Sequence, residues 1–534
     1  MKPALTVNAA RFWFNAATPR APFLRAAALV VIAAMLAAPA AVIAGALWGE
    51  GGALSAAAAA DYALQTALYA GCTVAFALAI ALPAAWLTVM RRFPGAGLVS
   101  WALFLPLALP PYITGYALSG FAETAAGIQP GGIIPAASAT ALAVYPYIYL
   151  FARGALQRQS CHIQSAARLM GYSPLAACGK ISWPLARPAV AAGAALALME
   201  TLNDFAVAEH YGVRALGLGV YDLWLNRGDI YAACRLAVLL MFVVFGLMVM
   251  EERGRKKQRH YAAQCDRCFA CDRAAPMSRT GGALCAAALL LPAAGGFFLP
   301  VLWFANLAWK TPPDLWRTPF WEGLGGSLML SLTVAAVLFI LAGIFAADKR
   351  RNGHGALFAP PAKLAQTGYA LPGAVLAQGF FLLAAWSGGA VIAFGGIALV
   401  IAACAARFFI IAVNALESGM TKIPPQLEAA ARLANKSASG ILWHVHLPLL
   451  RPALAAGALL AFLEGIKELP MTLILRPFDF NTLATVIYQY ASDESPELAA
   501  PAVLAMAALG AFAVSSLFIL EGKTRGAEGI RARR

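Results

Sequence analysis

The stretch Ala166-Ala-Arg-Leu-Met-Gly171, followed by Pro184-Leu-Ala-Arg-Pro188, occurs a second time as Ala430-Ala-Arg-Leu-Ala-Asn435 and Pro448-Leu-Leu-Arg-Pro452. The two copies are offset by 264 residues without a gap, and 17 of the 35 positions that start at Ala166 and Ala430 are identical. The matches include arginine, proline, glycine and glutamate, so the alanine-rich composition does not explain them. The chain therefore contains a duplicated unit.

The composition around this repeat is that of a membrane protein. Of the 534 residues, 61% are hydrophobic and only 12% are charged, and the mean hydropathy is +0.71. A soluble globular domain carries about twice that share of charged residues. A hydrocarbon core about 30 Å thick needs about 20 apolar residues per helix, and such runs recur along the whole chain. The sequence therefore predicts an all-α, polytopic transmembrane helical protein with about 12 spans. The expected spans are 24–48, 62–88, 97–120, 131–152, 188–208, 230–250, 283–308, 324–346, 366–387, 389–414, 452–474 and 498–520.

Six spans fall in each copy of the repeat, and the charges alternate between the loops. Basic residues crowd the N-terminus, the segment 153–187, the segment 253–273, the segment 422–451 and the C-terminal tail, whereas the alternate loops are acidic or nearly neutral. The positive-inside rule places both termini, the repeated loops and the central linker in the cytoplasm. Because six is even, the two halves form a parallel repeat. The net charge of +15 then reflects the side of the membrane and gives no reason to expect a nucleic-acid partner.

The expected organisation has three parts. Residues 1–250 form a first half with a cytoplasmic loop at about 160–188, residues 251–282 form a cytoplasmic linker, and residues 283–534 form a second half with its loop at about 424–452. The first apolar run exceeds the length of a signal-peptide core, so we expect a retained span in a multi-pass membrane protein.

Nine cysteines are present, and their scattered positions predict no disulfide framework. Cys265, Cys268 and Cys271 form a C-x-x-C-x-x-C run in the linker, which could hold a metal or an iron–sulfur cluster only with a fourth ligand such as His260 or Cys285. The alternative is that they are structural or incidental thiols. The sequence predicts no firm metal site and no cofactor.

The two repeated loops have the pattern of a helix, a turn and a second helix. Small residues at the start of each loop would let another backbone approach closely, Gly171 and Asn435 suit a left-handed turn, and Pro184 and Pro448 are expected to stop the second helix. The alternative is an ordinary connecting loop whose similarity survives from a duplication, but loops usually drift fastest. The candidate docking residues are Ser165, Ala166, Ala167, Gly171, Ile181, Pro184, Glu428, Ala430, Ala431, Asn435, Val445 and Pro448.

The spacing of these residues resembles the E-A-A-x-x-x-G-x(9)-I-x-L-P motif of permease subunits of bacterial binding-protein-dependent ABC importers. The chain looks like two such permeases fused. The resemblance implies that each loop is a coupling helix seated on a cytoplasmic ATPase, so two copies of an ABC ATPase subunit dock inside and a periplasmic substrate-binding protein docks outside. The motif's Glu is replaced by Ser165 and Ala429, and its Gly by Asn435, which puts in doubt an ATPase contact made by the Glu itself.

The chain itself is not expected to hydrolyse ATP. Gly522-Lys523-Thr524 resembles the end of a phosphate-binding loop, but the glycine that should precede it is Leu517 and no strand comes before it. We expect a transport subunit and no enzyme, with ATP hydrolysis by a separate partner.

Acidic residues occur at one equivalent depth in both halves. Glu200 and Glu464 lie about 13 residues beyond the loop arginines, roughly 20 Å along a helix, and Asp204 and Glu468 follow four residues later, which predicts the same helical face. Charges inside a membrane usually face a bundle interior or a watery cavity. The acids could line a translocation path for a hard cation. The alternative is an internal ion-pair network with Lys467 and Asn203.

Prolines interrupt two further spans. Pro110-Pro111 breaks the third span and Pro372-Gly373 breaks the ninth, and broken helices are tolerated where they line a cavity or pack against protein. The tyrosines beside these breaks are candidate gate residues, with packing or interfacial anchoring as the alternative. They are Tyr112, Tyr116 and Tyr369.

The segments after each coupling loop resemble the fused ferric-iron permeases. The resemblance rests on the runs Met199 to Phe205, Tyr211-Gly212, Lys467 to Pro477 and Thr482 to Thr485. It implies ferric iron as cargo. Fused thiamine permeases share the architecture, so a thiamine or other small-solute importer is the alternative. A secondary transporter of the major facilitator type is a further alternative, since it also has a six-plus-six parallel repeat, although the loops at 91–95 and 348–352 lack its basic motif.

Overall fold

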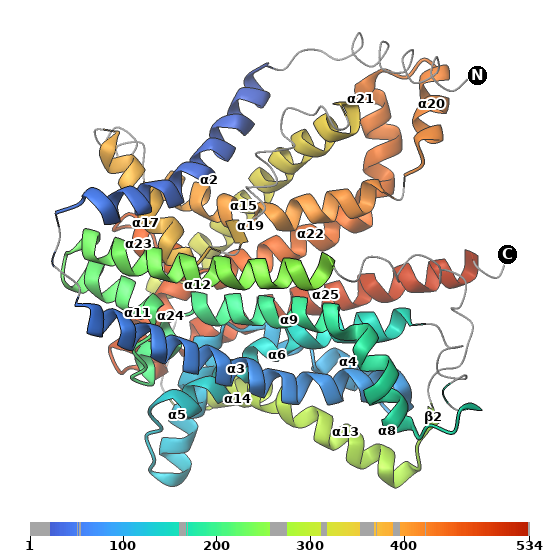
Figure 1. Cartoon of the computed structure of the whole chain (residues 1–534), viewed down its shortest axis with the longest axis horizontal. Helices are drawn as coiled ribbons and strands as arrows, with labels where there is room; N and C mark the ends of the chain where they lie inside the picture. Colours follow the sequence, from blue (N-terminus) through green and yellow to red (C-terminus); the bar gives the residue numbers. More distant parts are fainter. Residues whose placement is uncertain are drawn as a thin grey trace.

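The computed structural model describes residues 22–50, 52, 55–159, 167, 169–256, 275–310, 318–352, 368–369, 371–387, 396–421 and 423–531. Nearly all of these residues are helical (Figure 1). The long helices are α2 (Pro22–Trp48), α3 (Ala56–Met90), α5 (Pro111–Ala126), α6 (Ile133–Arg158), α9 (Trp183–Asn203), α12 (Ile230–Lys256), α13 (Arg279–Ala293), α14 (Leu299–Lys310), α15 (Thr318–Asn352), α17 (Gly373–Trp386), α19 (Gly396–Met420), α22 (Leu447–Lys467) and α25 (Pro496–Arg531).

Short elements join the long ones. They are α4 (Ala96–Ala102), η1 (Leu105–Ala108), α8 (Pro174–Ala177), η2 (Cys178–Ser182), α10 (Ala206–His210), α11 (Leu216–Tyr221), η3 (Asp222–Asn226), η4 (Ala294–Phe298), α20 (Pro425–Leu433), α21 (Ala438–Ile441), η8 (Leu442–His446), α23 (Pro470–Leu475) and α24 (Leu483–Ser492). Within the described residues the strands are limited to one parallel pairing of β1 (Arg91–Arg92) with β2 (Ala275–Pro276), which fastens the segment before α13 to the end of α3.

The predicted fold class is confirmed. Within the described part of the chain, eight helices are long and apolar enough to cross a membrane, and one further pair, Ala96–Ala108 with Pro111–Ala126, is bent by 98°. Three shorter apolar helices, Ala33–Trp48, Ile230–Gly246 and Gly373–Trp386, complete a set that coincides with the twelve predicted spans. The bend falls where Pro110 and Pro111 begin α5, because a proline cannot donate the hydrogen bond that would continue the preceding turn.

The offset of 264 residues holds for the structure as well as for the sequence. The π-helical turn η2 and the helix α9 reappear as η8 and α22 at positions shifted by that number. The other equivalent elements are α3 and α15, α5 and α17, α6 and α19, α8 and α21, α10 and α23, and α12 and α25. The packing repeats too, since α3, α6 and α9 pack together in the first half as α15, α19 and α22 do in the second. The duplicated sequence therefore folds into a duplicated structure.

The first helix of each half packs across the other half. Helix α2 packs against α17 of the second half as well as against α12, and α14 packs against α5 of the first half as well as against α25. Figure 1 shows α13 and α14 beneath the helices of the first half. Each half therefore reaches around its neighbour through its leading helix.

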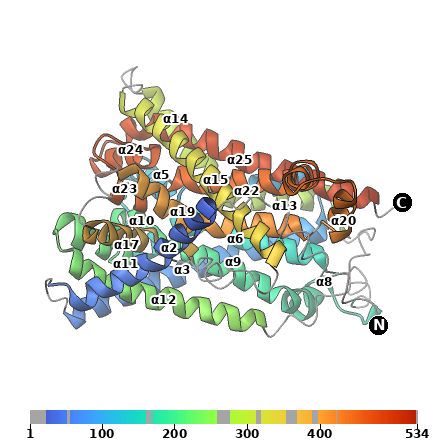
Figure 2. The same cartoon turned by 90° about the horizontal axis from the view of Figure 1, so that it is seen from above.

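The two coupling loops lie at the same end of the helix bundle. In Figures 1 and 2, α8 and α20 are at the right-hand end, together with the last turns of α25, whereas α11, α23 and α24 are at the opposite end. Large apolar side chains such as Phe242, Leu284 and Phe512 are exposed on the sides of the bundle, as expected where lipid replaces water. Exposed tryptophans close to helix ends suit the membrane interface. They are Trp48, Trp309, Trp321 and Trp386.

Candidate functional site

The coupling loops contain the same left-handed turn. Gly171 has φ +79° and Asn435 has φ +54°, which confirms the turn predicted for both residues. In each loop a backbone N–H just after the turn donates to a carbonyl five residues earlier, from Tyr172 to Ala167 at 3.0 Å and from Lys436 to Ala431 at 3.1 Å. These hydrogen bonds close the first short helix at its C-terminus.

The second short helix of each loop is capped by a serine and runs on into the span. The hydroxyl of Ser173 accepts the N–H of Ala176, and that of Ser437 accepts the N–H of Gly440. The expectation that Pro184 and Pro448 stop this helix is wrong. The π-helical turns η2 and η8 lead directly into α9 and α22, so the helix continues through Pro184 and Pro448, each the second residue of its span helix.

The exposure of the candidate docking residues differs between the loops. Ser165 and Ala166 lie outside the described residues. Ala167 is buried by its own chain, so its side chain does not offer a contact surface. In the second loop Ala430 and Pro448 are exposed and Ala431 and Val445 are half-buried, while in the first loop Ile181 and Pro184 are half-buried.

Two leucines that the sequence analysis gave no role are the most exposed apolar side chains among the described residues of the loops. Leu169 is 90% exposed and Leu433 is 87% exposed, and they occupy equivalent positions directly before the left-handed turns. An exposed leucine at the same place in both loops suits a contact with a partner. Their identity within the repeat was visible in the sequence, but their exposure was not.

Glu428 contacts its own loop. Its Oε1 lies 2.9 Å from His446 Nε2 and its Oε2 lies 3.4 Å from Arg432 Nη2. The side chain is buried, so it fastens the start of the second loop to η8. The equivalent of His446 in the first loop is Ser182, whose carbonyl accepts a hydrogen bond from Gln159 at 2.8 Å. The two loops thus share a backbone turn but differ in the side chains that brace it.

The central acids lie where their helices end. The predicted span containing Glu200 and Asp204 breaks between them, because α9 ends at Asn203 and Asp204 has an extended backbone. Asp204 Oδ1 then accepts the N–H groups of Ala206 and Val207 at the start of α10. The expectation that the two acids share one helical face is therefore wrong for this half.

The second half breaks at the equivalent residue. Helix α22 ends at Lys467, and Glu468 Oε1 accepts the N–H of Met471 at the start of α23. Glu464 and Glu468 therefore do not share a helical face either. Lys467 Nζ lies 3.2 Å from Glu464 Oε1, which confirms the predicted neutralisation of one acid of this pair.

Side chains of both halves meet at these breaks. Arg407 on α19 binds Glu468 Oε2 at 2.7 Å and lies 3.8 Å from Glu200 Oε2 of the first half. Tyr147 of the first half donates to Glu464 Oε1 at 3.3 Å. The predicted alternative of an internal ion-pair network therefore describes these contacts, and the network crosses between the halves.

Arg407 is the residue that the sequence analysis missed. It is 3% exposed and stands alone in an otherwise apolar run of α19. A single arginine within a predicted span was a usable signal, since such a charge is costly in a membrane unless it is paired. Its partners lie 61 and 207 residues away in the chain, so no local pattern reveals them.

The candidate gate tyrosines are divided between two places. Tyr112 and Tyr116 are buried on α5 directly after the break, with ring centroids 5.9 Å apart. The ring of His210 lies 4.8 Å from that of Tyr116. Tyr369 lies instead against Arg407, whose guanidinium carbon is 5.8 Å from the ring centroid. Tyr369 therefore contacts Arg407 of the central network, whereas the rings of Tyr112 and Tyr116 pack together beside the break.

No group of three or more His, Cys, Asp or Glu side chains among the described residues could hold a metal ion. The linker cysteines Cys265, Cys268 and Cys271 lie outside the described residues.

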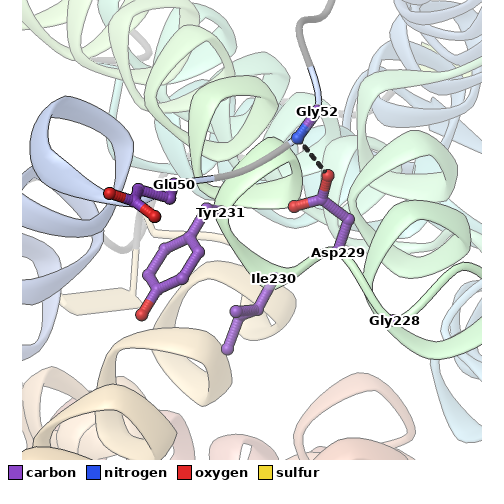
Figure 3. Close-up of a pocket in the computed structure, with 6 residues that line it drawn as sticks. All are labelled: Glu50, Gly52, Gly228, Asp229, Ile230 and Tyr231. Atoms are coloured by element: carbon purple, nitrogen blue, oxygen red, sulfur yellow. Dashed lines mark hydrogen bonds between the residues drawn. The ribbon is translucent and has the colours of Figure 1, made fainter.

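A pocket lies where α12 begins, at the end of the bundle opposite the coupling loops. Figure 3 shows the Asp229 carboxylate directed at the backbone nitrogen of Gly52, and Asp229 Oδ2 accepts that N–H at 2.6 Å. Arg235 Nη1 donates to the Gly52 carbonyl at 2.7 Å. Hydrogen bonds from the N–H groups of Ala232 and Gly52 hold the pKa of Asp229 below its usual value of 3.8. These hydrogen bonds of Asp229 and Arg235 with Gly52 connect the segment after α2 to α12, and we call them the Asp229 clip.

Taken together, these features define a polytopic helical membrane protein of two similar halves, with two matching loops at one end and charged side chains buried where the halves meet. A family model described as the inner membrane component of binding-protein-dependent transport systems matches residues 78–250 and 296–526. The chain belongs to this family. Membership implies a substrate-binding protein and an ATPase as partners, and it excludes the major facilitator alternative.

Individual relatives match about a third of the chain. The molybdenum transport system permease protein ModB of Escherichia coli (strain K12) is 26% identical over 204 residues, which are 34% of this chain and 87% of that protein. A Haloferax volcanii permease assigned by name to molybdenum transport is 22% identical over 182 residues, 33% of this chain and 67% of that protein. The Salmonella paratyphi A protein PhnU, assigned by name to 2-aminoethylphosphonate transport, is 26% identical over 182 residues, 30% of this chain and 62% of that protein.

Proposed function

We propose that this chain is the permease subunit, with two fused halves, of an importer in the bacterial inner membrane, through which ferric iron from a periplasmic binding protein enters the cytoplasm. Two copies of an ABC ATPase subunit would dock on the two coupling loops, one on each. Both chain termini and the linker would lie on the cytoplasmic side of the membrane, as the coupling loops would.

The observation that carries this proposal is the pair of matching loops at one end of the bundle. Each loop has a left-handed turn at Gly171 or Asn435 and an exposed leucine before it, at Leu169 or Leu433. Each also continues through a π-helical turn into a span that ends at a central acid. A push on either loop would therefore act along one rigid helix as far as the centre of the protein.

The docking claim is tested at the exposed leucines. Because Leu169 and Leu433 are almost fully exposed among the described residues, Leu169→Asp and Leu433→Asp should leave the protein folded while reducing copurification of the ATPase subunits. Phe478→Asp, at an exposed apolar position between α23 and α24 at the opposite end of the bundle, serves as a control for ATPase retention. If both loop variants retained the ATPase as the wild type does, the loops would not be the docking sites.

The ferric-iron assignment is supported by the resemblance of the segments after each loop and by the charge of the buried centre. Four acids, Glu200, Asp204, Glu464 and Glu468, lie at the helix breaks with two cations, Arg407 and Lys467. Carboxyl groups outnumber cationic groups here, and their oxygens suit a hard cation better than an anion. We propose that recognition of the cargo belongs chiefly to the binding protein.

The second candidate cargo is an oxyanion or a phosphonate, as the names of the relatives say of those proteins. Thiamine is a further small solute to be compared. The test is uptake into proteoliposomes that contain this chain, its ATPase and its binding protein, with labelled ferric iron, molybdate, 2-aminoethylphosphonate and thiamine offered separately. We expect accumulation of ferric iron alone, and preferential accumulation of molybdate or the phosphonate would replace the iron assignment while leaving the permease assignment intact.

A further inference from the structure

We infer that Arg407 is a positioning residue that holds the two halves together at their buried centre, and that its contact with Glu200 must open for cargo to pass. This inference rests on the proposed function as a permease, but not on the identity of the cargo. Neither the family match nor the relatives assign a role to Arg407.

The contact between Arg407 and Glu200 joins the two halves. Glu200 stands in the last turn of α9 in the first half, and Arg407 stands on α19 in the second half. Helix α9 is the same helix that continues from the first coupling loop through η2. A movement of that loop along the helix axis would therefore displace Glu200 relative to Arg407.

The two ion pairs of Arg407 differ in length. The bond to Glu468 within its own half is short, at 2.7 Å, whereas the distance to Glu200 of the other half is 3.8 Å. The first is a close, charge-assisted hydrogen bond and the second is a looser electrostatic contact. Arg407 is thus fixed to its own half and holds the other half by the weaker of its two contacts.

Other contacts between the halves lie beside Arg407, at Asn203 and Gly373. Asn203 Oδ1 accepts the N–H of Gly373 from the second half at 2.7 Å. A Cβ added to Gly373 would lie 3.0 Å from Glu468 Oε1, 3.1 Å from Asn203 Oδ1 and 3.2 Å from Arg407 Nη1. The glycine therefore allows the side chains of both halves to close around one small space.

The energy of breaking these two ion pairs differs as well. Arg407, Glu468 and Glu200 are all largely withdrawn from solvent, so their charges interact in a medium of low dielectric. Separating Glu200 from Arg407 leaves the Arg407–Glu468 pair intact and exposes one acid, whereas losing Arg407 strands two acids. A transport cycle can therefore open the Glu200 contact without dismantling the centre.

The experiment uses the reconstituted complex with its ATPase subunits and compares Glu200→Gln, Arg407→Gln and the double variant with the wild type. We expect Glu200→Gln to fold, because the Arg407–Glu468 pair survives, and to raise ATP hydrolysis in the absence of cargo by about fivefold or more. Ferric iron taken up per ATP hydrolysed should fall. The double variant should be no worse than Arg407→Gln, because both changes break the same contact. Additive effects, or unchanged cargo-free hydrolysis in Glu200→Gln, would overturn the inference.

The matched control is Arg214→Gln. It breaks the 2.9 Å pair of Arg214 with Asp61, which lies within the first half and is exposed. We expect its cargo-free hydrolysis to equal that of the wild type. A rise as large as that of Glu200→Gln would show that any lost ion pair uncouples the protein and would refute a special role for Arg407.

A second readout does not depend on transport. Spin labels at Glu123→Cys in the first half and Asp479→Cys in the second, in a background lacking the native cysteines, report the distance between exposed positions of the two halves. The inference predicts that Glu200→Gln broadens this distance distribution. An unchanged distribution in both Glu200→Gln and Arg407→Gln would contradict it, even if the wild type proved to carry a different cargo.

Discussion

Asp204 in the first half and Glu468 in the second occupy equivalent positions, cap equivalent short helices, and differ in their charge partners. Glu468 is bound by Arg407, whereas the residue equivalent to Arg407 in the first half is Ala143. Asp204 instead accepts backbone N–H groups at the start of α10. The duplication has thus kept the backbone and changed the charges. The shared backbone gives each half the same mechanical path, while the single arginine makes the second half the one that holds the centre.

Replacing Asp204 and Glu468 in turn should give the largest difference in stability between variants of the two halves. Glu468→Ala leaves Arg407 buried beside only the longer contact to Glu200, and breaking a buried pair costs about 3–5 kcal/mol. Asp204→Ala removes a helix cap, which costs about 1 kcal/mol. Thermal unfolding of the purified variants in detergent should therefore show a much larger fall in melting temperature for Glu468→Ala. Equal falls would mean that Arg407 does not distinguish the halves.

Two glycines should instead show that the halves are alike. A Cβ on Gly193 would lie 2.8 Å from Ile148 Cα, and a Cβ on the equivalent Gly457 would lie 2.6 Å from Ala415 Cβ. Gly193→Leu and Gly457→Leu should each destabilise the protein by about 1–3 kcal/mol through overpacking. Gly71→Leu is the control, because a Cβ there meets nothing within 4 Å. A variant that tolerated leucine in one half only would break the equivalence of the helix packing.

Substitutions at the two left-handed turns should change the local stability in opposite directions. Gly171→Ala places a Cβ at φ +79°, which costs about 1–2 kcal/mol in the left-handed region. Asn435→Gly should be neutral or slightly stabilising, because glycine adopts φ +54° without strain. Hydrogen exchange at Tyr172 and Lys436, whose N–H groups close the two turns, measures each change locally. Faster exchange at Lys436 in Asn435→Gly would contradict this account of the turn.

The smallest expected effect concerns the clip at Asp229, which lies directly before α12, whereas the equivalent Asp493 lies three residues before the start of α25 at Pro496. The lowered pKa of Asp229 means that its contribution is present above the usual value of 3.8 and is lost as the pH falls through the lower, folded value. We expect the protection of the Gly52 N–H, taken relative to the intrinsic exchange rate at each pH, to fall below about pH 4. Asp229→Asn should show that lower protection already at neutral pH, and a wild-type protection independent of pH would be inconsistent with the clip.

Much of the fold follows from local patterns. Apolar runs of about 20 residues locate the spans, because each helix must satisfy its own backbone in lipid. Gly171 and Asn435 identify the turns, because few other residues accept a positive φ. Lys467 and Glu464 meet because they are three residues apart on one helix.

The breaks and the central network could not be read in the same way. The chain remains apolar after Asp204, with Phe205-Ala-Val-Ala208, so hydropathy alone extends the helix through a residue where the backbone in fact turns. Pro184 and Pro448 read as helix stops, but a π-helical turn before each proline lets the helix continue. The contact of Arg407 with Glu200 depends on how two halves pack, and that information is absent from any local window of the sequence.

The most direct test of the central claim is uptake of labelled ferric iron by the reconstituted complex of this chain, its ATPase and its binding protein, measured with and without ATP. The account predicts accumulation only when ATP and the binding protein are both present, and its loss in the double variant Leu169→Asp/Leu433→Asp. Uptake by this chain alone, without ATP, would contradict the account.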